Sequence, residues 1–133
     1  MDNEARKTLL NQAKTIAVVG HSDKPHRTSY RIAEYLRQVG YRVYAVNPMI
    51  TEVAGERAYP SLADLPEQVD IVNVFRRSEE LDAVVAQAVA AGAGSVWAQL
   101  GVADQAAAQR ADAAGLPIVM DRCIMVDHRA LLG

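Results

Sequence analysis

The stretch IAVVGHSDKPHRTSYRIAEYLRQVGYRVYAVN, residues 16–47, decides the fold class of this chain. It opens with four apolar residues that end at Gly20 and predict a buried strand. A polar loop follows, and apolar residues at helical spacing then predict a helix over 28–39. Gly40 ends that helix, and 41–46 predicts a second strand. Because the first N–H groups of a helix attract anions, the unit is suited to binding phosphate.

The same alternation continues to the C-terminus. Ser78 suits the N-cap of a further helix, whereas 47–66 is rich in Pro and Gly and is predicted to be irregular. Strands are expected over 15–20, 41–46, 70–75, 95–99 and 116–120, with helices over 3–14, 28–39, from Ser78, over 103–114 and after Cys123. Strict alternation implies right-handed crossovers, so we expect an α/β fold with an open parallel five-stranded sheet and helices on both faces.

Length and composition restrict the possible classes of protein. The 133 residues suffice for a single domain, 1–133, and half of them are hydrophobic, as in a sheet covered by helices. A net charge of −2 offers no general attraction to nucleic acid or to anionic membranes, and no apolar run is long enough to cross a bilayer. We therefore expect a cytoplasmic protein that binds neither nucleic acid nor membranes. Cys123 is the single cysteine, so no internal disulfide can form.

In such folds the ligand lies beyond the carboxyl ends of the strands, where the strand order reverses. Several loops at that edge carry cations or hydrogen-bonding side chains, which favours an anionic ligand although the chain is slightly acidic. The residues concerned are His21, Ser22, Lys24, His26 and Arg27, then Asn47 and Pro48, then Arg76 and Arg77, then Gln99 and Gly101, and finally Arg122.

Several familiar site motifs are absent. Gly20 is not followed by the further glycines of a dinucleotide fingerprint, and the second strand ends without the acidic residue that holds a ribose. Lys24 is followed by Pro25, which disfavours a P-loop, and it occupies the position where a hydrolase elbow needs glycine. The three histidines lack metal-ligand spacing, so no metal site is expected.

Five separated segments resemble those of the small stand-alone CoA-binding proteins. These segments are 18–30, which contains VVGHS and PHRTSY, then GYRVYAVNP over 40–48, VDIVNVFR over 69–76, VWAQLG over 96–101 and DRC over 121–123. That family is similar to the CoA-binding domain of the succinyl-CoA synthetase alpha subunit, so the resemblance implies a Rossmann-like fold and coenzyme A as the ligand. It also implies a set of cofactor-binding residues, namely Gly20, Ser22, Lys24 and Arg27 around the phosphates, Asn47 and Pro48 on the nucleotide side, Val74, Phe75 and Arg76 at the next edge, and Gln99 and Gly101 on the far side. Val74 and Phe75 could equally be core residues at a strand end, and for Val74 the core position is preferred.

We expect non-catalytic binding of CoA or of an acyl-CoA, because the chain lacks the second synthetase domain and its phosphorylated histidine. No catalytic residue is assigned, and the protein partner, if any, is unknown. A nicotinamide-nucleotide enzyme or redox sensor is one alternative, and a protein-interaction module with a vestigial nucleotide pocket is another. Cys123 follows the last strand at the ligand edge, where it would either meet the CoA thiol or serve as a small buried hydrophobe.

Overall fold

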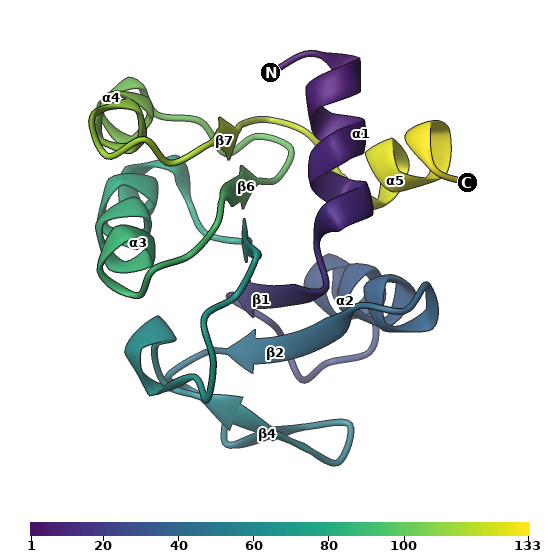
Figure 1. Cartoon of the computed structure of the whole chain (residues 1–133). Coiled ribbons are helices and arrows are strands. Elements are labelled where there is room, and N and C mark those ends of the chain that lie inside the picture. The colour runs from purple at the N-terminus through teal and green to yellow at the C-terminus, as the bar shows by residue number, and fades with distance from the viewer.

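A seven-stranded sheet forms the centre of the chain in a computed structural model that describes all residues, 1–133. The strand order is β3-β4-β2-β1-β5-β6-β7, and every neighbouring pair is parallel except β3 and β4 (Figure 1). The strands are β1 (Thr15–Val19), β2 (Arg42–Val46), β3 (Glu52–Val53), β4 (Glu56–Tyr59), β5 (Ile71–Val74), β6 (Val96–Ala98) and β7 (Ile118–Val119).

The expected count of five strands is wrong, because β3 and β4 lie inside the stretch that was predicted to be irregular. They form a short antiparallel hairpin whose two-residue turn holds Ala54 at φ 50° and Gly55 at φ 83°. Two successive positive φ values are typical of a type I′ turn, for which Asn-Gly is the usual sequence signal. The turn has alanine, Ala54, in place of the usual asparagine, so the sequence lacks this turn signal. In addition, β3 has only two residues, which is too short for the alternating pattern of a strand to be recognised. The five predicted strands themselves are confirmed as β1, β2, β5, β6 and β7.

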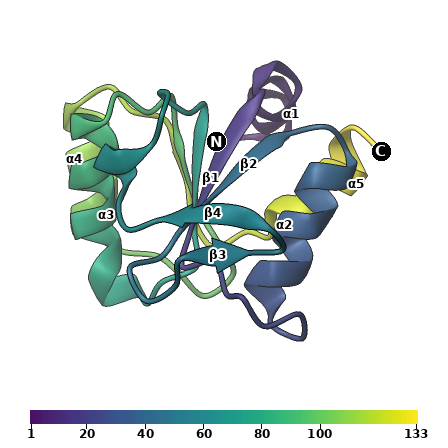
Figure 2. The same ribbon diagram turned by 90° about the horizontal axis from the view of Figure 1, so that it is seen from below.

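Helices cover both faces of the sheet, as expected. Figure 2 shows α3 and α4 on one face and α1, α2 and α5 on the other. The helices are α1 (Asn3–Gln12), α2 (Thr28–Gln38), α3 (Ser78–Ala90), α4 (Gln105–Ala113) and α5 (Ile124–Leu131), with a 3₁₀ turn, η1, at Leu62–Asp64. None of these helices is both long and apolar enough to span a membrane.

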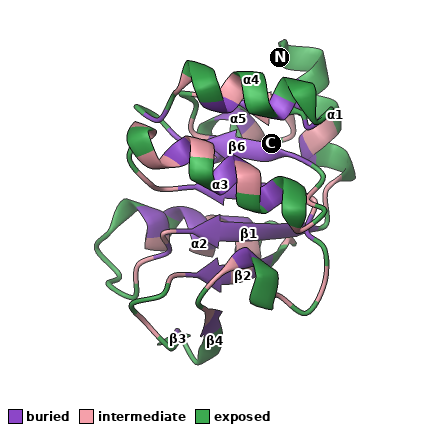
Figure 3. Cartoon of the chain, turned by 90° about the vertical axis from the view of Figure 1, so that its left-hand side faces the viewer, coloured by how far each residue is buried: buried purple, intermediate pink, exposed green.

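Two large apolar cores result, one on each face of the sheet, and a third, small cluster joins β2 to the hairpin through Ala45, Val53 and Ala58. In β1, Ala17 and Val19 pack in the core beneath α3 and α4, whereas Ile16 and Val18 pack in the core beneath α1, α2 and α5. Figure 3 shows the central strands buried and the outward faces of the helices exposed. Burial on both sides explains why the strands are continuous apolar runs rather than alternating ones.

Ser78 does not cap α3, because Arg77 occupies the N-cap position. The Ser78 hydroxyl instead donates to the carbonyl of Gly101 at 3.1 Å and accepts from the backbone N–H of Ala103 at 3.0 Å. It therefore fastens the loop after β6 to the start of α3.

Candidate functional site

The strand order reverses between β1 and β5. From β1 the chain continues to β2 on one side, whereas β5 and β6 lie on the other side. The crevice at this switch point is bounded by the loops after β1, β2, β5 and β6, which hold the predicted site residues.

Gly20 lets the chain leave β1 in close contact with β5. It has a φ of +88°, and a Cβ at this position would lie 2.3 Å from the carbonyl oxygen of Phe75. Its N–H donates to the carbonyl of Val46 at 2.9 Å. Since only glycine combines this backbone conformation with this approach, Gly20 brings the ends of three strands together.

The loop from Gly20 to α2 is held by its own hydrogen bonds. Ser22 donates its N–H to the Ser29 hydroxyl at 3.0 Å, and its own hydroxyl accepts from the N–H of Lys24 at 3.0 Å. Arg27 is the N-cap residue of α2, in an extended conformation, and its side chain makes no capping hydrogen bond. The first N–H groups of α2 therefore face the loop without a side-chain acceptor, which is the arrangement that binds phosphate.

Positive charge at this edge is available to a ligand. Neither Arg27 nor Arg76 has a carboxylate within 4.0 Å, and Lys24 is mostly exposed, with its Nζ 4.0 Å from Asp23. By contrast, Arg42 at the opposite edge of the sheet is paired with Glu67 at 2.7 Å. The unpaired arginines here can receive a phosphate through forked hydrogen bonds.

Asn47 shapes the site from the β2 side without offering its amide freely to a ligand. Its Nδ2 donates to the carbonyl of His21 at 3.0 Å, and its Oδ1 accepts from the N–H of Met49 at 2.9 Å. Asn47 thus joins the loop after β2 to the loop after β1, and Pro48 is exposed beside it.

A pocket of about 560 Å³ adjoins the start of α2. It combines arginine side chains with apolar walls, and its lining residues are Thr28, Ile32, Phe75, Arg76, Arg77, Glu80, Gln99, Leu100, Val102 and Cys123. The structure therefore brings three predicted residues, Phe75, Arg76 and Gln99, into one pocket. Gln99 donates from Nε2 to Oδ1 of the fully buried Asn73 at 2.5 Å, which fixes its side chain.

Comparison with known proteins identifies the family. The family described as "CoA binding domain" matches residues 14–129. The chain belongs to this CoA-binding domain family.

An uncharacterised protein of Bacillus subtilis, YneT, is 42% identical over 92% of this chain and 90% of its own length. A hypothetical protein from Pyrococcus horikoshii has a solved structure with a TM-score of 0.96 at 40% identity, covering all of this chain and 94% of that one. An ADP-forming acetate–CoA ligase of Archaeoglobus fulgidus is 40% identical over 44% of this chain but only 8% of the ligase.

The other eight predicted cofactor-binding residues of this CoA-binding domain do not line the pocket. Six of them lie in the loops after β1 and β2 described above, namely Gly20, Ser22, Lys24, Arg27, Asn47 and Pro48. The remaining two are Val74 and Gly101. Val74 is fully buried in the core beneath α3 and α4, as the interpretation of this residue as core predicts. Gly101 lies in the turn after β6, where its N–H donates to Asp121 at 2.7 Å and its carbonyl accepts from Ser78. It supports the far wall rather than lining the pocket.

Other lining residues were missed by sequence reasoning. Thr28 and Ile32 lie one helical turn apart on α2 and both reach the pocket, but the helical spacing of Ile32 predicted only a core position. Leu100 is 68% exposed beside Gln99. The sequence signal that could have identified Leu100 as a lining residue is its position directly after the predicted strand 95–99, at the ligand edge.

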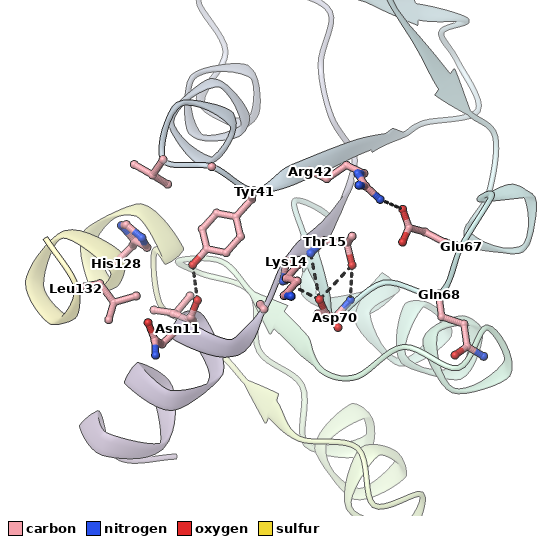
Figure 4. Close-up of a pocket in the computed structure, with 14 residues that line it drawn as sticks. Asn11, Lys14, Thr15, Tyr41, Arg42, Glu67, Gln68, Asp70, His128 and Leu132 are labelled. Atoms are coloured by element: carbon pink, nitrogen blue, oxygen red, sulfur yellow. Dashed lines mark hydrogen bonds and ion pairs between the residues drawn. The ribbon is translucent and has the colours of Figure 1, made fainter.

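A larger hollow, of about 680 Å³, opens at the opposite edge of the CoA-binding domain (Figure 4). Two of its polar side chains already make hydrogen bonds within the protein: Asp70 accepts from Lys14 N at 2.7 Å and from Thr15 N at 3.1 Å, and Tyr41 donates to the carbonyl of Leu10 at 2.6 Å. Burial raises the pKa of Tyr41 to about 12, so the phenol stays protonated. With these groups occupied internally and the strands' carboxyl ends elsewhere, this hollow is not the candidate site.

Proposed function

We propose that this protein binds coenzyme A or an acyl-CoA at the carboxyl edge of the sheet and catalyses no reaction on it. The observation that carries the proposal is the uncapped start of α2, which directly follows the loop that Gly20 brings close to β5. The pyrophosphate of CoA suits this position, because backbone N–H groups and the helix dipole both favour negative charge there.

The charges around the loop fit CoA better than a nicotinamide dinucleotide. CoA carries a 3′-phosphate, which an acidic ribose clamp at the end of β2 would repel, and this chain has Asn47 and Pro48 there instead. Arg27 and Arg76, without carboxylate partners, are positioned to neutralise a terminal phosphate. The thiol-bearing arm would then extend along the pocket that Phe75, Leu100 and Cys123 line.

A binding role is favoured over catalysis because Ser22 and His21 of the loop do not form a nucleophile and base pair. The Ser22 hydroxyl accepts from Lys24, and both ring nitrogens of His21 contact other groups, Ser22 and Arg37. A nucleophilic serine needs a base that hydrogen-bonds its hydroxyl, and the His21 ring makes no hydrogen bond to the Ser22 hydroxyl.

Calorimetric titration with CoA, dephospho-CoA and NADH tests the proposal. We expect CoA to bind in preference to NADH, and Arg27→Ala to weaken CoA binding about tenfold, as expected for one charge-assisted contact. Arg42→Ala is the matched control, because it removes an arginine from the opposite edge of the sheet. Tighter binding of NADH would support the nicotinamide alternative, and no binding of any of the three would support a protein-interaction role.

Alkylation of Cys123 tests where the thiol-bearing arm lies. Cys123 is partly exposed and lines the pocket, so bound CoA is expected to slow its reaction with iodoacetamide several-fold. Intact-protein mass spectrometry over time gives the rate. An unchanged rate at saturating CoA would place the arm elsewhere.

A further inference from the structure

His21 is the one fully buried titratable side chain in the loop that follows β1. Its ring lies edge-to-face against Tyr30 of α2, with the ring centres 6.0 Å apart, and its carbonyl accepts from Asn47 after β2. His21 therefore touches the loop, α2 and the end of β2, which are the three elements that frame the phosphate position.

The hydrogen bonds of the ring assign its protonation state. Nδ1 lies 2.7 Å from the carbonyl oxygen of Ser22, so this nitrogen must carry a hydrogen and donate it. Nε2 lies 3.3 Å from Nη1 of Arg37, which can only donate, so Nε2 must be the acceptor. The imidazole in this position is thus neutral, in the Nδ1–H form.

Protonation would break this arrangement. A hydrogen on Nε2 would face the guanidinium N–H of Arg37, and two positive charges would lie against each other. Glu34, 3.3 Å from Arg37, is the one carboxylate near the pair and is already bound to Arg37. Burial lowers the pKa of His21 below its usual 6.5, and the charge of Arg37 lowers it further, against opposing contributions from the Ser22 carbonyl and Glu34. A protonated His21 ring loses its hydrogen bond from Arg37 and is repelled by that guanidinium, so the ring is driven away from Arg37 and strains the Ser22 contact that it shares with the loop.

We propose that His21 is a positioning residue of the phosphate-binding loop that keeps the loop in its ligand-binding shape only while the imidazole is neutral. Ligand binding is then coupled to a proton: a molecule with protonated His21 releases that proton to solvent when it binds. This coupling rests on the proposed function for the identity of the ligand, but the state of His21 can be read without any ligand.

The binding test uses dephospho-CoA, because the 3′-phosphate of CoA has its own ionisation near pH 6 and would obscure the histidine. We expect calorimetric affinity to be constant near pH 8 and to fall toward pH 5, approaching about tenfold per pH unit once His21 is mostly protonated. His21→Gln, which cannot titrate, should remove this dependence. His26→Gln, an exposed histidine of the same loop, should keep it.

A second variant and a ligand-free measurement complete the test. Arg37→Gln removes the neighbouring cation, so it should move the midpoint of the pH dependence to higher pH. In the free protein, the ring ¹⁵N shifts of His21 should show the Nδ1–H form, and the amide signals of Ser22 and Lys24 should move with the His21 titration. An Nε2–H form, loop amides that ignore the titration, or an equal pH dependence in wild type and His21→Gln would overturn the proposal. Absence of binding at every pH would refute the proposed function, and the loop amides would still decide whether His21 controls the loop.

Discussion

Gly20 is the residue at which a single added methyl group would disturb both the fold and the site. Alanine there would meet two penalties, an unfavourable φ of +88° and a Cβ 2.3 Å from the carbonyl oxygen of Phe75. We expect Gly20→Ala to lower the free energy of unfolding by about 3 kcal/mol and to weaken CoA binding, since the loop must shift to relieve the contact. Urea unfolding and calorimetry measure the two effects.

Gly115→Ala provides the matched control for this substitution. Gly115 has a similar φ of +69°, but its added Cβ would meet no atom within 4 Å. Gly115→Ala should lower the free energy of unfolding only through its unfavourable backbone conformation, by about 1 kcal/mol, and should leave CoA binding intact. Equal losses of stability in the two variants would show that the contact with Phe75 is relieved at no cost.

At the scale of elements, Asp127 joins α1 to α5. This nearly buried carboxylate lies 3.1 Å from Nε of the equally buried Arg6 in α1, and it also accepts two hydrogen bonds from Arg122, at 2.6 and 2.9 Å. Asp127→Asn would leave the Arg6 charge buried without a counter-charge, so we expect it to lower the free energy of unfolding by about 3 kcal/mol.

The control for the Asp127 prediction is another arginine–aspartate pair. Asp82 binds Arg110 at 2.6 Å, but both side chains are well exposed to water, so Asp82→Asn should cost clearly less. Denaturant unfolding of the two variants side by side makes the comparison. If Asp127→Asn proved no more damaging than Asp82→Asn, the link between α1 and α5 would contribute little to stability.

At the scale of the whole molecule, two histidines make stability depend on pH. Burial lowers the pKa of both His21 and His128 in the folded state below the usual 6.5. Above pH 6.5 both states are neutral at these positions and the stability is complete. As the pH falls below that value the unfolded chain binds protons first, so the free energy of unfolding decreases, by at most about 1.4 kcal/mol per pH unit for each histidine.

Urea unfolding at several pH values between about 8 and 5 measures this dependence. The window separates the histidines from Glu67 and Asp82, whose pKa values are lowered by their arginine and tyrosine hydrogen bonds and whose contribution is lost only in stronger acid. His21→Gln should make the decrease shallower. Stability that stayed constant or rose on acidification would contradict the burial of these rings.

Much of this protein is determined by local pattern in its sequence. The alternation of apolar runs and amphipathic segments predicted five of the seven strands and the helices between them, because burial on a sheet face and on a helix face each imposes its own period. The order of the elements then placed the loops after β1, β2, β5 and β6 at one edge, and with them Arg27, Arg76 and Gln99.

The tertiary structure alone decided which of those side chains face a ligand and which hold the site in shape. Asn47 and His21 are 26 residues apart, and Arg37 lies 16 residues from His21, so no local period could show that they hydrogen-bond. Likewise, the hairpin of β3 and β4 exists because β4 pairs with β2, and its own residues are too few to signal a strand.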